Sequence, residues 1–218
     1  MEYKTYIKRV IKEYKCASIG DEYRTIPIYE DGELRGFLKP VTYLYKIIKP
    51  TWPRLICQWR IENELAFANR FVGTEEKTIN WLDNILLPRA DRILFMVCNV
   101  DNIPIGHLGY SCFDFVNRSC EIDNVVRGVK EGNKGLMSSA MNTILKWGRD
   151  VLELDNIYLK VLSDNKYAIK FYKRLGFIVK WYIPLYKVEK PDITEWVEDQ
   201  NSIETPDKFF IYMQYVGE

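Results

Sequence analysis

The segment NKYAIKFYKRLGF, residues 165–177, carries a side chain that is well suited to acid chemistry, Tyr172. Asn165 is a typical N-cap and Gly176 a typical helix terminator, so the segment predicts a short helix. Tyr172 stands on the apolar face of that helix. A phenol with a pKa near 10 stays protonated at neutral pH and can donate a proton. Tyr172 is therefore either a packing residue or a proton donor.

A glycine-rich loop, VVRGVKEGNKGLMSSAM, lies between a predicted strand and a predicted helix. Gly128, Gly132 and Gly135 let the backbone approach a ligand closely, and free amides at a helix N-terminus bind phosphate. Lys130 and Lys134 add positive charge. The loop predicts a phosphate site, although it contains neither GxGxxG nor GxxxxGK[ST].

Two carboxylates precede this loop in EIDNVVRG. Because strand side chains alternate, Glu121 and Asp123 are predicted to share one face with Val125 and Arg127. Carboxylates buried beside a cleft acquire a raised pKa and can accept a proton, but an ion pair with Arg127 explains them equally well. His107 is the next candidate base, although a lone histidine on a strand is more often a core residue.

Hydrophobic periodicity outlines the elements that must position these groups. We predict helices over 3–15, 74–87, 135–152 and 165–176, with a helix or helix and loop over 55–71. Strands are predicted over 23–29, 34–41, 92–100, 103–113, 120–129, 157–162, 177–188 and 209–216, an irregular loop over 49–53 and a long acidic excursion over 189–207. This order indicates a single α+β domain spanning 1–218, with a mixed, mostly antiparallel sheet flanked by helices.

Composition excludes several other classes of protein. The 31 basic and 30 acidic side chains nearly cancel, so no overall charge favours nucleic acid or a membrane surface. The five cysteines are an odd number without CxxC spacing, and the N-terminal residues are charged, so we expect a cytoplasmic protein. With one histidine we expect no metal site, and no apolar run approaches the roughly 20 residues of a membrane span.

The strand, glycine loop and helix of residues 121–152, followed by a strand and NKYAIKFYKRLGF, resemble the GNAT superfamily of coenzyme A-dependent N-acyltransferases. The resemblance covers residues 34–186 in element order and is concentrated in 121–177. It implies a GNAT-like fold with an N-terminal extension and a long loop before the last strand. It also implies transfer of an acyl group from acetyl-CoA, or another acyl-CoA, to an amine.

The same resemblance assigns residues to the cofactor. The family loop reads Q/R-x-x-G-x-G/A, and GNKGLM departs from it at Gly132 and Met137. Backbone amides of the loop are expected to hold the diphosphate, and they belong to Gly132, Asn133, Lys134, Gly135, Leu136 and Met137. The pantetheine arm is expected between the main chain of Val125, Val126 and Arg127 on one side and Asn165, Ala168 and Phe171 on the other. Tyr172 is expected to protonate the departing thiolate, with Asp123 or Glu121 as the base.

The acceptor is expected to be a small-molecule amine. Glu62 and Asn63 in CQWRIENE match the family helix that lies against the acceptor, and His107 is the third expected contact. The run from EIDNVVRG to NKYAIKFYKRLGF is also similar to bacterial members that acylate nucleotide-linked amino sugars, which is the leading hypothesis.

Residues outside that run are candidates for stacking and for contacts with a diphosphate. Aromatic rings of two segments suit stacking on a sugar or nucleobase, and they also suit a second core or a homodimer interface: Tyr43, Tyr45, Trp52, Trp59, Trp181, Tyr182, Tyr186 and Trp196. Cations near the first group, Lys46, Lys49 and Arg54, suit a diphosphate. The alternatives are a protein or peptide N-acetyltransferase that uses the acidic stretch 189–207, or a non-catalytic coenzyme A-binding module.

Overall fold

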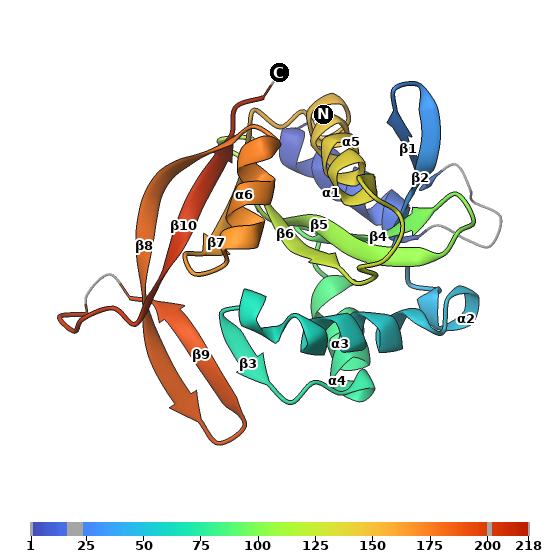
Figure 1. Cartoon of the computed structure of the whole chain (residues 1–218). Helices are drawn as coiled ribbons and strands as arrows, with labels where there is room; N and C mark the ends of the chain where they lie inside the picture. The colour runs from blue at the N-terminus through green and yellow to red at the C-terminus, as the bar shows by residue number, and fades with distance from the viewer. Residues whose placement is uncertain (1, 17–23, 200–201, 218) are drawn as a thin grey trace.

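The computed structural model describes residues 2–16, 24–199 and 202–217, and within these ranges its strands form one ten-stranded mixed sheet (Figure 1). The sheet order is β1-β2-β4-β5-β6-β7-β10-β8-β9-β3. The strands are β1 (Ile26–Glu30), β2 (Glu33–Pro40), β3 (Asn69–Phe71), β4 (Ile93–Asn99), β5 (Pro104–Asp114), β6 (Ser119–Arg127), β7 (Asn156–Leu162), β8 (Phe177–Lys190), β9 (Ile193–Glu198) and β10 (Lys208–Tyr215). The helices are α1 (Tyr3–Lys15), α2 (Tyr45–Ile48), α3 (Trp52–Glu62), α4 (Glu75–Trp81), α5 (Leu136–Asp150) and α6 (Lys166–Arg174), with short 3-10 and π turns at 64–66 and 82–86. The predicted α+β class is confirmed.

Helices cover both faces of the sheet (Figure 1). Helices α1, α5 and α6 lie on one face, and the larger core cluster fills the space between them and the sheet. Helices α2, α3 and α4 lie on the other face over a smaller cluster that contains the buried rings of Tyr45, Trp52 and Trp59. These three rings therefore belong to a second core, not to an acceptor site.

The parallel pair β6 and β7 opens a cleft in the middle of the sheet. Their ladder contains three residue pairs, from Ser119 opposite Asn156 to Glu121 opposite Tyr158. Past this point β6 pairs only with β5, and β7 pairs with β10. The two strands therefore separate, and the gap between them is available to a ligand.

Local sequence signals account for the elements beside this cleft. The Asp31-Gly32 turn has two positive φ angles, 52° and 82°, as a two-residue hairpin requires. Asn165 caps α6 by accepting a hydrogen bond from the amide of Ala168 at 3.1 Å, and Gly176 ends the helix with φ 89°. These predictions from the sequence are confirmed.

Two predicted loops are wrong in part, because each contains a segment of regular structure. The proline-rich stretch 49–53 already contains the start of α3, because Pro53 occupies the first turn, where a missing amide hydrogen costs nothing. The acidic stretch 189–207 contains strand β9, which pairs with β8 and β3. Its acids did not prevent pairing, because Glu195 and Glu198 form ion pairs with Lys190 and Lys160.

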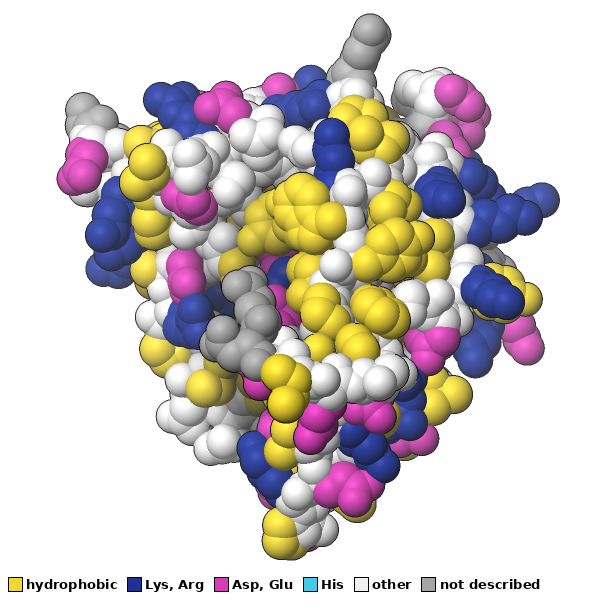
Figure 2. All heavy atoms as spheres, turned by 90° about the vertical axis from the view of Figure 1, so that its left-hand side faces the viewer, with side chains coloured by type: hydrophobic (Ala, Val, Ile, Leu, Met, Phe, Trp, Pro, Cys, Tyr) yellow, Lys and Arg dark blue, Asp and Glu magenta, His cyan; other side chains and the backbone are white. Residues whose placement is uncertain are grey.

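The side of the sheet formed by β8 and β10 exposes hydrophobic side chains, which gather in Figure 2. Trp181 is 51% exposed and stacks on Tyr212, which in turn stacks on Tyr158. Exposed apolar patches of this kind are used for association, so a homodimer stays a prediction. Within the described ranges, no helix is long and apolar enough to cross a membrane.

Lys15, at the end of α1, is a buried cation whose ammonium donates to three backbone carbonyls. The acceptors are Leu86 at 2.7 Å, Leu87 at 3.3 Å and Arg89 at 2.6 Å, so Lys15 ties α1 to the turn after α4. Lys15→Met leaves all three carbonyls without this donor and is expected to lower the free energy of unfolding by about 2–4 kcal/mol. Chemical denaturation measures this, with the exposed Lys12→Met as the control. Equal stability of the two variants would contradict this role.

Candidate active site

The cleft between β6 and β7 contains a cavity of about 530 Å³. Its walls come from the end of β6, the loop and first turn of α5, and α6. Most residues assigned to the cofactor line it, namely Val125, Val126, Arg127, Asn133, Lys134, Gly135, Met137, Asn165, Ala168 and Phe171, together with Tyr172 and Asn63. A strand, a loop and a helix thus meet around one elongated space, as an extended thioester arm requires.

Two residues that were assigned to the cofactor through their backbone amides, Gly132 and Leu136, do not line the cavity. Gly132 does not line the cavity, and open space surrounds the position where its Cβ would stand. Leu136 is 2% exposed and packs in the core, because it is the first residue of α5 and turns its side chain toward the sheet. The side chain of Met137 also joins the core cluster, so its bulk is largely directed away from the loop backbone.

Arg127 holds the glycine loop in place. Its guanidinium donates to the backbone carbonyls of Val129 at 3.0 Å, Lys130 at 2.5 Å and Gly132 at 3.4 Å. The alternative of an ion pair between Arg127 and Asp123 is wrong, because Arg92 is the cation near Asp123, at 3.7 Å. The fixed loop ends at Gly135, whose φ of 86° turns the chain into α5 and presents the helix N-terminus to the cavity. These features fit the diphosphate of coenzyme A.

Tyr172 lies at the inner end of the cleft. Its ring is 8% exposed and packs edge-to-face against Phe171 and Phe177. Burial, and then the negative charge of Asp123, raise the pKa of the Tyr172 phenol above its usual range. Tyr172 is therefore a protonated hydroxyl within electrostatic range of Asp123.

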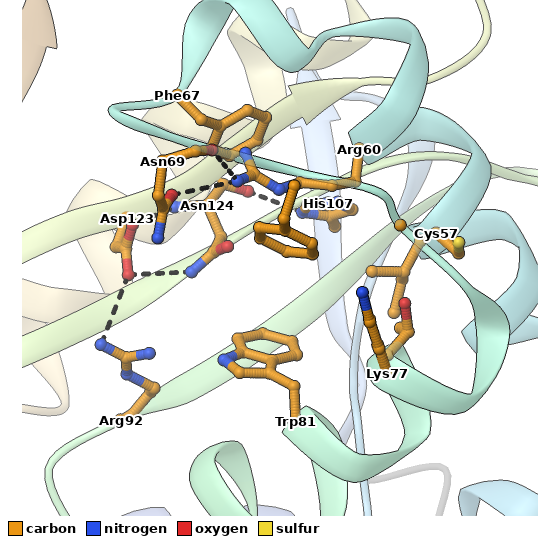
Figure 3. Close-up of a pocket in the computed structure, with 14 residues that line it drawn as sticks. Cys57, Arg60, Phe67, Asn69, Lys77, Trp81, Arg92, His107, Asp123 and Asn124 are labelled. Carbon is orange, nitrogen blue, oxygen red and sulfur yellow. Dashed lines mark hydrogen bonds and ion pairs between the residues drawn. The ribbon is translucent and has the colours of Figure 1, made fainter. Parts of the chain in front are cut away.

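A second cavity, of about 350 Å³, lies on the α3 side of the sheet (Figure 3). Its lining includes three aromatic rings, Phe67, Phe71 and Trp81, and three cations, Arg60, Lys77 and Arg92. Asn69, Thr78, His107, Asp123 and Asn124 add polar groups. Asp123 is the single carboxylate that the described residues contribute to this lining. The second cavity is therefore cationic and aromatic.

A bulge in β6 lies between the two cavities. Asn124 has φ 54°, and the pairing of β6 with β5 shifts register beside it. The Asp123 carboxylate accepts hydrogen bonds from the Asn124 backbone amide at 2.6 Å and from its side-chain amide at 2.8 Å. These two bonds hold Asn124 in a conformation that is uncommon outside glycine.

The bulge overturns the prediction that Glu121, Asp123, Val125 and Arg127 share one face. Alternation holds up to Asp123 and is reset at Asn124, so that Val125 packs against the core under α5. Asp123 lines the second cavity, whereas Val125 lines the first. The strand therefore presents a carboxylate to one cavity and its backbone to the other, within a few residues.

Glu121 lines neither cavity, because it stands one step behind Asp123, opposite Tyr158 of β7. Burial, and then the charge of Asp123, raise the pKa of the Glu121 carboxyl to about 7. Between about pH 4.5 and pH 7 the folded state consequently binds this proton more tightly than the unfolded state, so stability falls as pH rises through that window.

Glu121→Gln removes the free-energy cost of ionising a buried carboxyl. We expect the variant to exceed the wild type in free energy of unfolding by on the order of 2 kcal/mol at about pH 8, and to show no gain at about pH 4. Urea denaturation at the two pH values measures the difference. A gain of the same size at both pH values would show that the Glu121 charge is not the cause.

Arg60 lines the second cavity, and the sequence did not suggest it. Its guanidinium lies 3.5 Å from the centre of the Phe67 ring, and Nη2 donates to the backbone oxygen of Asn69 at 2.7 Å and to its Oδ1 at 3.0 Å. Nη1 is buried and has no hydrogen-bond partner among the described residues. Burial lowers the pKa of Arg60 to about 10, so the guanidinium stays charged at neutral pH.

The remaining predicted acceptor contacts fall in different places. His107 lines the second cavity, whereas Asn63 lines the first and donates to the Trp59 carbonyl at 2.8 Å. Glu62 lines neither cavity, is exposed and accepts a hydrogen bond from Gln58, so its contact with the acceptor stays a prediction. The sequence analysis did not identify Trp81 or Arg92 as cavity residues. Trp81 belongs to an ordinary amphipathic helix pattern and Arg92 to a strand pattern, and only the fold places them in the same cavity as His107.

Comparisons with known proteins agree with this geometry. The model of the acetyltransferase (GNAT) family matches residues 43–177, more than half of the 218 residues. No curated protein matches the sequence significantly.

Three solved structures share the fold. A probable GNAT-family acetyltransferase from Chromobacterium violaceum aligns with TM-score 0.63 and 15% identity over 87% of this chain and 85% of its own. Spermidine N-acetyltransferase from Vibrio cholerae, in complex with CoA and spermine, aligns with TM-score 0.60 and 16% identity over 81% and 92%. RimL, a ribosomal L7/L12 α-N-protein acetyltransferase, aligns with TM-score 0.64 and 12% identity over 87% and 92%. The chain belongs to the GNAT acetyltransferase family and is an acyl-CoA-dependent N-acyltransferase.

Proposed function

We propose that this enzyme acylates the amine of an anionic small molecule, and specifically of a nucleotide-linked amino sugar. The observation that carries the proposal is the second cavity, where Arg60, Lys77 and Arg92 surround a space of about 350 Å³. A diphosphate supplies the negative charge that balances these cations. The rings of Phe67, Phe71 and Trp81 suit a sugar or base face.

The charge of this cavity argues against a polyamine or a basic peptide. Asp123, its carboxylate, already accepts two hydrogen bonds from Asn124 and lies near Arg92. A polycation placed there meets three like charges, each costing binding free energy in a partly desolvated site. The cavity is cationic, whereas a polycation such as the spermine bound to the Vibrio cholerae enzyme requires an anionic site.

The two cavities suggest how the reaction proceeds. Asp123 faces the acceptor cavity and takes the proton of the incoming amine, directly or through water. The thioester arm is expected along Val125, Val126 and the inner wall of α6. The amine nitrogen bonds to the thioester carbonyl carbon and the C–S bond breaks, and Tyr172, which is protonated at the start, gives its proton to the departing thiolate. Asp123 then releases its proton to solvent and Tyr172 regains one from solvent. Glu121 has no direct part, because it lines neither cavity.

Thiol release from acetyl-CoA tests the proposal with three amines: a UDP-linked amino sugar, spermidine and a peptide with a free N-terminus. Turnover of the nucleotide sugar is expected. Turnover of spermidine or the peptide, without turnover of the nucleotide sugar, would contradict it.

A matched pair of variants on α3 locates the contact. Arg60→Met is expected to lower kcat/KM for the nucleotide sugar about 10- to 100-fold, the value of one charge-assisted hydrogen bond. Arg54, which the sequence also suggested for a diphosphate, is exposed on the same helix and lines neither cavity, so Arg54→Met is expected to change nothing. Equal losses in both variants would point to a general charge effect.

A further inference from the structure

His107 is the one histidine of the sequence, and it is buried at the floor of the acceptor cavity. It is 3% exposed, stands on β5 in register with Val126 of β6, and its ring lies 6.1 Å from that of Trp59. An imidazole in such a position must satisfy two ring nitrogens.

Nδ1 of His107 forms a hydrogen bond with the backbone of the bulge. It lies 2.6 Å from the backbone carbonyl of Asn124, the residue with φ 54°. Burial chiefly lowers the pKa of His107 to about 4, with the charge of Arg60 acting in the same direction, so the ring is neutral at physiological pH. A carbonyl accepts only, so Nδ1 carries the hydrogen and donates it. Nε2 is then a bare acceptor.

Nε2 has no hydrogen-bond partner among the described residues, and the same is true of Nη1 of Arg60. Both side chains line the acceptor cavity, and Figure 3 draws them together. The side chains that line the cavity therefore carry one unused acceptor, Nε2 of His107, and two unused donors, Nη1 of Arg60 and Nε of Arg92, and all three atoms are buried. Of the two donors, Arg60 is the one that is electrostatically coupled to His107. Leaving such groups unpaired costs roughly 1–3 kcal/mol each, which a suitable ligand recovers.

A hydroxyl group complements such a pair, because it donates one hydrogen bond and accepts another. We propose that His107 and Arg60 recognise a hydroxyl of the acceptor, which donates to Nε2 of His107 and accepts from Nη1 of Arg60. This inference rests on the proposed function and deepens it, since a sugar ring carries hydroxyls beside its amine and spermidine carries none. His107 is in addition a positioning residue, because Nδ1 holds the bulge that separates the two cavities.

Two substitutions separate these roles. His107→Asn keeps a donor at the position of Nδ1, so it is expected to keep the bulge and the wild-type KM for acetyl-CoA, at the cost in stability of a smaller buried side chain. It loses the acceptor at Nε2. His107→Gln places an amide at the position of Nε2 and loses the tether to Asn124.

The readout is the preference for a hydroxylated acceptor over its deoxy analogue, measured as a ratio of kcat/KM. The wild type is expected to prefer the hydroxylated amino sugar about 10- to 100-fold, as for other buried hydrogen-bond pairs. His107→Asn is expected to lose this preference with KM for acetyl-CoA unchanged, and His107→Gln, which loses the tether to Asn124, is expected to keep much of it with KM for acetyl-CoA raised. A wild-type preference in His107→Asn, or parallel losses in both variants, would overturn the inference. Absence of turnover with any amino sugar would instead contradict the proposed function.

Nitrogen NMR of the wild type gives an independent test that needs no variant, because the single histidine produces one pair of ring signals. Nδ1 is expected to be protonated and Nε2 unprotonated at neutral pH. Addition of the UDP-linked amino sugar is expected to shift the Nε2 signal toward a hydrogen-bonded value and to leave Nδ1 unchanged. An unmoved Nε2 signal at saturating acceptor would overturn the hydroxyl contact.

Discussion

Tyr172→Phe is expected to lower kcat about 100-fold at neutral pH while KM for acetyl-CoA stays within about twofold. The substitution removes only the hydroxyl from a ring that packs between Phe171 and Phe177, so the cleft keeps its shape. Because burial raises the pKa of the phenol, the wild-type hydroxyl stays protonated throughout a normal assay. Steady-state kinetics with saturating acceptor measures the loss.

The dependence of this loss on pH identifies its cause. A thiol with a pKa near 8.5 leaves without help once the solution is more basic, so the gap between Tyr172→Phe and wild type is expected to narrow above about pH 9. Tyr29→Phe is the control, since Tyr29 is 58% exposed on β1, lines neither cavity and is expected to lose nothing. An unchanged kcat in Tyr172→Phe would assign Tyr172 to packing alone.

Asp123→Asn is expected to lower kcat/KM for the acceptor roughly 100- to 1,000-fold. The amide can keep the bonds to Asn124, because the Asn124 side chain can rotate and offer its oxygen, so the bulge is expected to persist. What disappears is the charge that draws a proton from the ammonium group. Kinetics at varied acceptor concentration measures this.

Raising the pH supplies more neutral amine and is expected to recover part of the Asp123→Asn loss. Asp150→Asn, at the exposed end of α5, is the control for a lost carboxylate. A loss that does not depend on pH would show that Asp123 acts by holding the bulge and not as the base.

The cofactor side of the site could be predicted from the sequence because it is built from consecutive elements. Asn165, Gly176 and the loop ending at Gly135 are local signals with fixed backbone consequences, and each has the expected conformation. The direction of the side chains was not predicted there. Leu136 turns inward because a helix has only one buried face, which the loop motif does not specify.

The acceptor side could not be predicted in the same way. The left-handed conformation of Asn124 cannot be recognised from the alternating pattern of β6. Because of this one residue, the side chains after Asn124 point to the opposite face of the sheet from the one that the alternation predicted. Arg60, Trp81 and Arg92 come from three separate elements and meet only in the fold. The acidic composition of β9 likewise concealed a strand that ion pairs stabilise.

A crystal structure with both coenzyme A and a UDP-linked amino sugar bound tests the proposed reaction most directly. The sulfur of coenzyme A is expected within hydrogen-bond reach of the Tyr172 hydroxyl, about 4 Å or less. The amine of the sugar is expected within reach of Asp123, and the diphosphate of the UDP-linked sugar near Arg60. A sulfur remote from Tyr172, or a sugar bound outside the cavity of Arg60 and His107, would contradict the account.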